Sequence, residues 1–376
     1  MFRFQVISLL LPVLVNRKRK FSAGEHELIG DAINLPKPGG GGGSSAQRPL
    51  TLPNGLKLSY GQIIALAGDF YGVPEEPIVD PTEKPNERVS GRCKRFMAAY
   101  STLAHDHIKE EVDQILKIMT EEKGAIENEL VEKWDKITGG KWIFGVPVVF
   151  GQVMKLAQNN YDHFMPSAKD AYLIGHQIAL EKAKLASKAG TLEQQTKMLD
   201  EAYSVDAFAC HFLTDSFSSG HLRTPRRELS RQVTPSLVGD YLCKYMHDED
   251  NEYGLNVTNK RGEKWIAYGD GRLFDEESRE NYKMAVAAVQ ASVNHIFEAF
   301  ERPHETSSSD RVTDYIPFVD PNARNNSPMF QVKDGILVRR TDLENLGDFT
   351  TTSNWFGMET VMKGRSYSPH GSVTGE

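Results

Sequence analysis

The stretch His211-Phe-Leu-Thr-Asp215-Ser-Phe-Ser-Ser-Gly220-His221 joins a helical pattern to two kinds of metal-binding side chain. Residues four apart lie one above the other on a helix, so His211 and Asp215 share one face. The helical pattern breaks at Ser219-Gly220, which allows His221 to return toward the same point. Imidazole and carboxylate are ligand types of zinc, so the stretch predicts a helix that ends in a metal site. A half-buried helix with one hydrogen-bonded histidine and one solvated aspartate is the alternative.

Apolar side chains recur at steps of three and four in four segments, which is the pattern of amphipathic helices. The segments are residues 108–119, 171–185, 199–212 and 286–300. The second is expected to stop near Gly190 and the fourth before Pro303. Helices of this length, separated by loops, predict a compact all-α bundle.

Changes in composition divide the chain into four parts. Residues 1–20 hold a short apolar run followed by a basic cluster, which suits a signal or anchor segment but is short for a membrane span. Residues 21–50 contain a glycine-rich stretch, residues 36–45, expected to be flexible and without a regular element. Residues 51–305 form the predicted helical domain. Residues 306–376 form a predicted irregular extension with one strand-like run at residues 335–339.

Charge and cysteine usage narrow the function classes. The chain has 376 residues and a net charge of −7, which argues against a protein that holds nucleic acid on a broad basic surface. Its three cysteines, Cys93, Cys210 and Cys243, offer no CxxC pair and no even-numbered disulfide framework. Cys210 is expected to be a buried thiol rather than a ligand. The apolar start favours a secreted or extracellular protein, with an intracellular location as the alternative.

Further candidate donors are scattered along the chain. His163 lies in a loop before the second helix, and Asp69 lies in Gly68-Asp-Phe-Tyr-Gly72, where the backbone turns tightly and presents an acid. His247 is followed by several acids, and His26 lies between two glutamates. The group His105-Asp106-His107 is another possible donor set. For each of these an ordinary solvated polar side chain is the alternative.

The order of these residues resembles the zinc-dependent bacterial phospholipase C family. A His-Phe pair near a helix start is followed by His-x-x-x-Asp, with a second histidine six residues further on. The resemblance is close over residues 161–226 and looser over residues 60–300. That family prefers phosphatidylcholine and shares its fold with fungal nucleases specific for single strands. The resemblance therefore implies an all-α phospholipase C-like bundle with three zinc ions at the bottom of a cleft.

Position by position, the resemblance implies a set of zinc ligands. His163, His211 and His221 would bind zinc, and Asp215 would bridge two ions. Asp69 resembles an upstream ligand beside the attacking water, so it is also the candidate catalytic residue. His26 resembles the histidine of the family's first helix.

Two departures from the family bear on the number of zinc ions. No tryptophan precedes His26, whereas the family begins with a tryptophan whose amine and carbonyl bind zinc. In place of the family's His-x-x-x-Glu, Asn251 stands four residues after His247. The carboxylate partner of His247 would then be Asp250 or Asp248, and Asp250 is the expected one. The expected cofactor is thus two or three zinc ions.

The resemblance implies hydrolysis of phospholipid head-group diesters at a membrane surface, releasing diacylglycerol and a phosphorylated head group. Phe70, Tyr71, Tyr161 and Phe164 lie beside candidate ligands and are candidate contacts for a quaternary ammonium group, with core packing the alternative for at least two. A single-strand nuclease or 3′-nucleotidase on the same fold is the second hypothesis, although the acidic charge disfavours nucleic acid. A non-catalytic helical protein that binds zinc or a partner is the third. The sequence identifies no protein partner.

Overall fold

The structure is a computed structural model. It describes residues 23–376 except residues 85, 87, 122–126, 270, 274, 306–307 and 365. The predicted signal or anchor segment, residues 1–20, lies outside the described residues.

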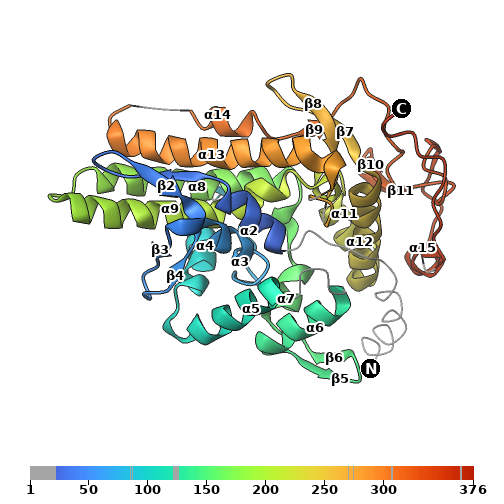
Figure 1. Cartoon of the computed structure of the whole chain (residues 1–376). Coiled ribbons are helices and arrows are strands. Elements are labelled where there is room, and N and C mark those ends of the chain that lie inside the picture. Colours follow the sequence, from blue (N-terminus) through green and yellow to red (C-terminus); the bar gives the residue numbers. More distant parts are fainter. Residues whose placement is uncertain are drawn as a thin grey trace.

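Three long helices form the centre of the molecule and run side by side across the upper half of Figure 1. They are α8 (Ser167–Ala186), α9 (Leu192–Asp215) and α13 (Arg279–Glu301). They correspond to three of the four helices predicted from apolar periodicity, and α5 (Lys109–Glu121) corresponds to the fourth. The predicted helices are therefore confirmed, although α9 and α13 each begin seven residues before the apolar repeat does.

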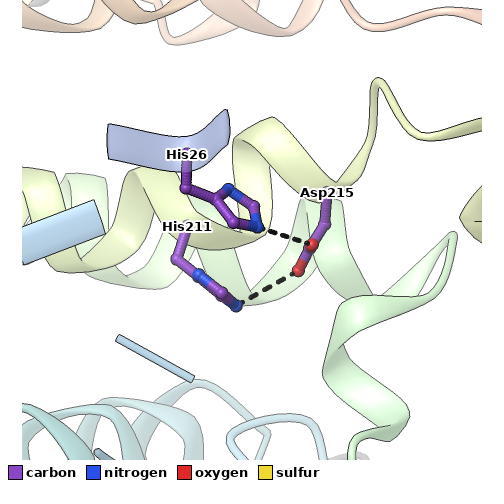
Figure 2. Close-up of side chains that lie close together, drawn as sticks. All are labelled: His26, His211 and Asp215. Atoms are coloured by element: carbon purple, nitrogen blue, oxygen red, sulfur yellow. Dashed lines mark ion pairs between the residues drawn. The ribbon is translucent and has the colours of Figure 1, made fainter. Parts of the chain in front are cut away.

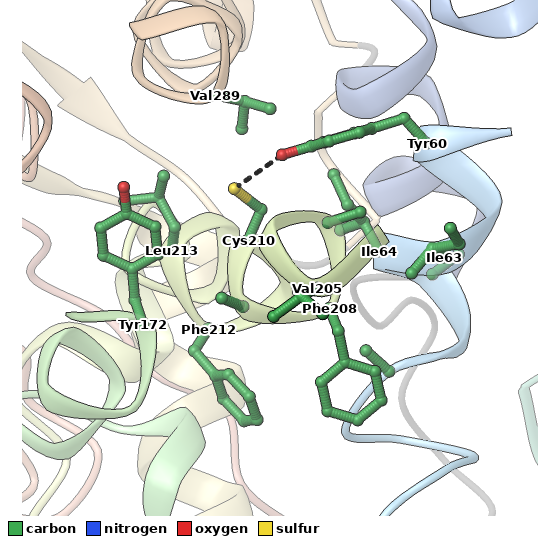
Figure 3. Packing of buried hydrophobic residues seen from close by; sticks show 14 of the residues in the cluster. Tyr60, Ile63, Ile64, Tyr172, Val205, Phe208, Cys210, Phe212, Leu213 and Val289 are labelled. Atoms are coloured by element: carbon green, nitrogen blue, oxygen red, sulfur yellow. Dashed lines mark hydrogen bonds between the residues drawn. The ribbon is translucent and has the colours of Figure 1, made fainter. Parts of the chain in front are cut away.

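Helix α9 is the central element because its second half is buried on all sides. Every side chain from Tyr203 to Asp215 is buried, which is the pattern of a core helix rather than of a surface helix. Figure 3 shows Phe208 and Phe212 on one side of α9 and Cys210 on the other, where it meets Tyr60. The Tyr60 hydroxyl donates to Cys210 Sγ at 3.3 Å, which confirms the expected buried thiol.

The remaining elements surround this centre. The helices are α2 (Ala23–Asp31), α3 (Tyr60–Leu66), α4 (Arg88–Leu103), α6 (Glu127–Ile137), α7 (Gln152–Gln158), α10 (Ser219–Leu222), α11 (Arg226–Gln232), α12 (Ser236–Tyr253), α14 (Asp310–Thr313) and α15 (Gly357–Gly364). The short antiparallel strands are β1 (Asn34–Pro36), β2 (Gly42–Ser44), β3 (Leu50–Thr51), β4 (Lys57–Leu58), β5 (Lys141–Ile143), β6 (Val146–Val149), β7 (Leu255–Thr258), β8 (Lys264–Ala267), β9 (Phe318–Val319), β10 (Phe330–Lys333), β11 (Ile336–Arg340) and β12 (Thr351–Thr352). Helices hold 53% of the residues and strands 12%, so the fold is mostly helical rather than all-α.

The glycine-rich stretch is an ordered hairpin, so the expectation that it lacks regular structure is wrong. Strands β1 and β2 pair in antiparallel fashion. Gly39, Gly40 and Gly41 between them have φ values of +80° to +93°. Glycine adopts this conformation readily, so the same glycines that suggest flexibility build the turn. Leu35 of β1 is buried in the main core, which places this segment with the helical domain.

The C-terminal extension is also more regular than expected. The strand-like run is confirmed as β11, which pairs with β10 and β12 in a three-stranded sheet. Apolar residues of the extension form a second buried cluster with helices α11 and α12. The cluster includes Leu229, Val238, Leu242, Met246, Met329, Phe330, Leu337, Leu343 and Val361. The extension is therefore packed on the helical domain and covers the outer face of α12.

Within the described residues, no helix combines the length and the apolar character needed to cross a membrane.

Candidate metal centre

Four histidine rings from different elements surround the carboxylate of Asp215, the last residue of α9. His26 comes from α2, His163 from the 3-10 turn Tyr161–His163, His211 from α9 and His221 from α10. All four rings and the carboxylate are buried, with Asp215 only 2% exposed. Figure 2 shows the rings of His26 and His211 pointing at opposite oxygens of Asp215. The structure thus brings together donors that lie as far as 195 residues apart in the chain.

The two oxygens of Asp215 face two different sets of donors. Oδ2 lies 3.1 Å from His163 Nδ1 and 3.5 Å from His211 Nε2, and these two ring nitrogens are 3.3 Å apart. Oδ1 lies 3.4 Å from His221 Nδ1 and 3.7 Å from His26 Nε2. The carboxylate therefore lies between two donor sets, as a ligand shared by two ions would.

Hydrogen bonds fix the ring orientation of two histidines. His211 Nδ1 donates to the Ile64 carbonyl oxygen at 3.0 Å, because a carbonyl only accepts. The Thr214 hydroxyl donates to the carbonyls of Cys210 and His211, so it accepts from His26 Nδ1 at 2.7 Å. In the neutral rings these bonds leave Nε2 of His26 and of His211 unprotonated and facing Asp215. Such second hydrogen bonds are typical of metal-bound histidines.

The donor set fits a zinc ion on two counts. In tetrahedral sites with bonds of about 2.0–2.2 Å, ligand atoms lie roughly 3.3–3.6 Å apart, close to the separations around Asp215 Oδ2. In addition, Asp215 Oδ2 and His221 Nδ1 are buried and have no hydrogen-bond partner of acceptable geometry. Buried polar atoms without partners are costly, and a cation in each donor set would satisfy the unpaired atom of that set. Mixed nitrogen and oxygen donors suit zinc.

The buried, negatively charged carboxylate of Asp215 is stabilised by a positive charge beside it. Burial lowers the pKa of His163, but Asp215, Asp69 and Asp162 outweigh burial and raise that pKa to about 9. Burial raises the pKa of Asp215, yet His211, His163 and His221 outweigh it and hold the pKa well below its usual range. Either a proton on His163 or a metal ion can supply the required positive charge.

Asp69 lies at the solvent side of the centre, in the tight turn after α3. Its Oδ1 is 3.9 Å from His163 Nδ1, and its side chain is 42% exposed. Asp69, His163 and His211 each offer an atom within a sphere that one ion could fill. Gly68 allows the turn that carries Asp69 to lie this close to the two histidines. Its φ is +70°, a conformation that favours glycine, and a Cβ at this position would lie 2.5 Å from His211. The exposed position suits a residue that contacts water and substrate.

His247 lies next to the ring of His221, one of the four histidines around Asp215. The two ring centroids are 5.0 Å apart, and His247 Nδ1 donates to Asp248 Oδ1 at 3.0 Å. Asn251, at the position of the family's glutamate, accepts from the Gly220 backbone N–H at 2.6 Å and from the Ser218 hydroxyl at 3.0 Å. Asn251 therefore holds the turn that carries His221. The sequence signal for this role is the small, polar run Ser218-Ser-Gly220.

Asp250, the expected partner of His247, forms an ion pair with Arg223. Arg223 donates to both of its carboxylate oxygens, at 2.7 and 2.9 Å. The same guanidinium donates to the Asn326 carbonyl oxygen of the C-terminal extension. A bidentate pair of this kind fixes both carboxylate oxygens on the guanidinium. Sequence reasoning missed Arg223 because its partner lies 27 residues away on α12.

The four aromatic candidates make contacts within the protein. Phe70 packs edge-on against Trp134, and the buried Tyr71 donates its hydroxyl to Glu111. Phe164 is buried against the rings of His221 and His247. The Tyr161 ring already faces the guanidinium of Arg226 at 5.1 Å. The core-packing alternative thus holds for Phe70, Tyr71 and Phe164, and Tyr161 is occupied by a protein cation.

Of the other polar candidates, Asp162 lies beside the centre, whereas the group at residues 105–107 lies on the surface away from it. Asp162 Oδ1 lies 3.9 Å from His163 Nε2, and its other oxygen accepts from the Ile78 N–H. A cavity of about 30 Å³ beside His163 has room for one water. The group of His105, Asp106 and His107 is exposed on the surface and forms no part of the centre.

Comparisons of the chain with protein-family models, with curated proteins and with solved structures gave no match.

Proposed function

We propose that this protein is a zinc-dependent phosphodiester hydrolase that acts on phospholipid head groups. The observation that carries the proposal is the buried carboxylate of Asp215 between two sets of imidazole nitrogens. The likeness of the His211, Asp215 and His221 spacing to zinc-dependent phospholipases C supports the choice of reaction. The net charge of −7 supports a lipid rather than a polynucleotide substrate.

The reaction needs charge neutralisation and a hydroxide near neutral pH, because a phosphodiester is itself anionic. Zinc bound at the centre supplies both, since it lowers the pKa of its water toward about 7. His163, His211 and Asp215 would hold one ion, and His26 and His221 would hold a second through the other oxygen of Asp215. Residues of the chain keep these donors fixed, because Ile64 and Thr214 hold two of the rings.

Asp69 is the proposed group at the reacting end of the centre. Its carboxylate is the most exposed of the candidate ligands, and it lies beside His163. From this position it can accept a proton from the attacking water or orient that water toward phosphorus. An Asp69→Asn variant should therefore keep most of the bound zinc and lose turnover, because an amide cannot accept that proton.

The test combines metal analysis with a substrate panel. The purified chain should contain zinc and should hydrolyse phosphatidylcholine or another phospholipid, with activity lost on chelation and restored by zinc. Asp215→Asn should lose both zinc and activity, whereas His107→Ala, an exposed histidine outside the centre, should keep both. Full zinc content and full activity in Asp215→Asn would overturn the proposal. Hydrolysis of single-stranded DNA alone would replace the lipid substrate with a nucleic acid.

A further inference from the structure

The hairpin of β5 and β6 displays apolar side chains to solvent. Ile143, Phe144, Val148 and Val149 are exposed, and Phe144 is fully exposed at the tip. Figure 1 shows the hairpin at the lower edge of the molecule, beyond α6 and on the opposite side from α13. Exposed large apolar residues gathered on one element mark an interaction surface more often than a folding requirement.

Phe144, at the tip of the hairpin, is not a residue type that this two-residue turn favours. Phe144 and Gly145 connect the paired residues Ile143 and Val146, and both have positive φ, at 51° and 72°. Two-residue turns of this kind prefer asparagine, aspartate or glycine at the first position. The hairpin of β10 and β11 follows this preference, with Asp334 and Gly335 at φ 52° and 79°. The conformation of the turn therefore does not account for phenylalanine at the tip.

The base of the hairpin is held rigidly, so the tip is presented in a fixed position. The buried carboxylate of Asp135 on α6 accepts from the Trp142 indole N–H at 2.7 Å and from the Gly151 backbone N–H at 2.9 Å. These two residues precede and follow the exposed tip. The Asp135 side chain fixes both ends of the hairpin to α6. Loose packing or fraying of the loop therefore does not explain why its apolar residues are exposed.

Positive charge accompanies the apolar tip. Residues 138–160, the hairpin and the helix that follows it, carry two lysines and no acid, in a chain whose net charge is −7. The lysines are Lys141 and Lys155, and both are exposed. Apolar residues flanked by lysines match a membrane surface with anionic head groups, where the apolar side chains enter the interface and the lysines meet phosphate.

We propose that the β5–β6 hairpin docks this protein on anionic lipid surfaces, with Phe144 inserted between head groups. Docking at the hairpin does not require the metal centre. It goes beyond the proposed hydrolase activity, because it assigns the surface through which the whole molecule meets a bilayer.

The test measures partition of the full chain onto vesicles with and without Phe144. Wild type and Phe144→Asp are sedimented with vesicles of phosphatidylcholine and phosphatidylserine, and with vesicles of phosphatidylcholine alone. Phe144→Asp should lower partition onto the mixed vesicles by about tenfold, since one large apolar side chain leaves the interface and a negative charge enters it. Wild-type partition should also weaken with salt and be lower on phosphatidylcholine alone.

Controls separate docking from folding and from catalysis. Aspartate suits the first position of this turn, so Phe144→Asp should unfold at the same or higher urea concentration than wild type. Phe356→Asp, at another phenylalanine that is 64% exposed, should leave partition unchanged. Hydrolysis of the soluble diester bis(4-nitrophenyl) phosphate should be equal in wild type and Phe144→Asp. Absence of that hydrolysis in both would count against the hydrolase and not against docking.

Two results would overturn the docking proposal. The first is partition of Phe144→Asp within twofold of wild type. The second is a wild-type dimer in solution that Phe144→Asp converts to a monomer while neither protein binds vesicles, which would make the hairpin an interface between two copies of the chain.

Discussion

Gly68 is a residue whose missing side chain makes room for the centre. A Cβ at this position would lie 2.5 Å from His211 Cδ2 and Nε2 and 3.0 Å from His163 Cε1, at a φ of +70°. Gly68→Ala should therefore lower the free energy of unfolding by roughly 2–4 kcal/mol and displace both rings. Urea unfolding measures the first effect, and zinc titration of the chelated protein measures the second as a weaker affinity.

Gly335→Ala is the matched control for this substitution. Gly335 has a similar φ, +79°, but a Cβ there would meet no atom within 4 Å. Gly335→Ala should lower the free energy of unfolding by about 1 kcal/mol, from backbone strain alone, and should leave the zinc affinity unchanged. Equal losses in the two variants, with zinc affinity retained in Gly68→Ala, would show that crowding of the rings is not what Gly68 avoids.

His295 gives a pH dependence that is independent of the metal centre. His176 Nδ1 donates to the Asp206 carboxylate at 2.7 Å, so the neutral His176 ring accepts through Nε2 from His295 Nδ1 at 2.8 Å. Burial, together with the charge of His176, lowers the pKa of His295 to about 4. Because the folded pKa lies below the ordinary value near 6.5, the neutral ring stabilises the fold above pH 6.5 and this stability is lost as pH falls toward 4.

The measurement is the free energy of unfolding at pH 7 and at pH 4.5 in wild type and in His295→Asn. Wild type should lose about 1–2 kcal/mol more over this range than the variant, and the comparison cancels contributions from all other groups. His295→Asn is also expected to be less stable at pH 7, so the slope and not the absolute stability is the readout. Parallel pH profiles in the two proteins would refute the assignment.

Single residues of the centre could be predicted where the relevant spacing is local. His211 and Asp215 lie on α9 and His221 on the short helix α10 just after it, and His163 and Asp69 stand in recognisable loop contexts. The bond of Asp250 to Arg223 could not be predicted, because it depends on how α10 packs on α12, which no periodicity encodes. The break in the helix also falls earlier than expected, since α9 ends at Asp215 and Ser219-Gly220 begins α10.

At the scale of elements, long helices could be predicted and short strands could not. The four predicted helices repeat apolar residues over three or more turns, so their signal accumulates. Strands of two to four residues, such as β1 and β2, offer too few positions for an alternating pattern. In the glycine-rich stretch, composition alone does not distinguish a flexible spacer from a turn that needs positive φ at three successive residues.

One ion pair joins the C-terminal extension to the helix that carries His247. Arg340 of β11 is fully buried and donates to both oxygens of Glu249 on α12, at 3.0 and 2.7 Å. Tyr367 also donates to Glu249. Arg340→Met should cost about 3–5 kcal/mol of unfolding free energy, because it leaves the Glu249 carboxylate buried without its cation.

A double-mutant cycle separates the unpaired charge from lost packing. If the uncompensated carboxylate dominates, Arg340→Met combined with Glu249→Met should be more stable than Arg340→Met alone. Urea unfolding of the four proteins gives the coupling free energy. Additive losses, with the double variant the least stable, would mean that the pair itself contributes little.

Among the residues that the structure describes, buried apolar clusters extend across the domain boundaries expected near residues 50 and 306. The main buried cluster extends from Ala23 to Ile316, and the second cluster combines α11 and α12 with residues after 328. The boundaries were inferred from composition and loss of helical period. Those signals report local structure and not which apolar faces cover one another.

A chain that ends at Asp320 should therefore fail to keep the geometry of the candidate metal centre. Removal of the extension exposes Leu229, Val238, Leu242 and Met246 and leaves Glu249 without Arg340. It also removes the Asn326 carbonyl that holds Arg223, two residues after His221. The truncated chain should aggregate or unfold at markedly lower urea, and any soluble fraction should bind zinc more weakly than the full chain. Equal unfolding midpoints and equal zinc affinity in the two chains would show that α12 and His221 are positioned by the helical domain alone.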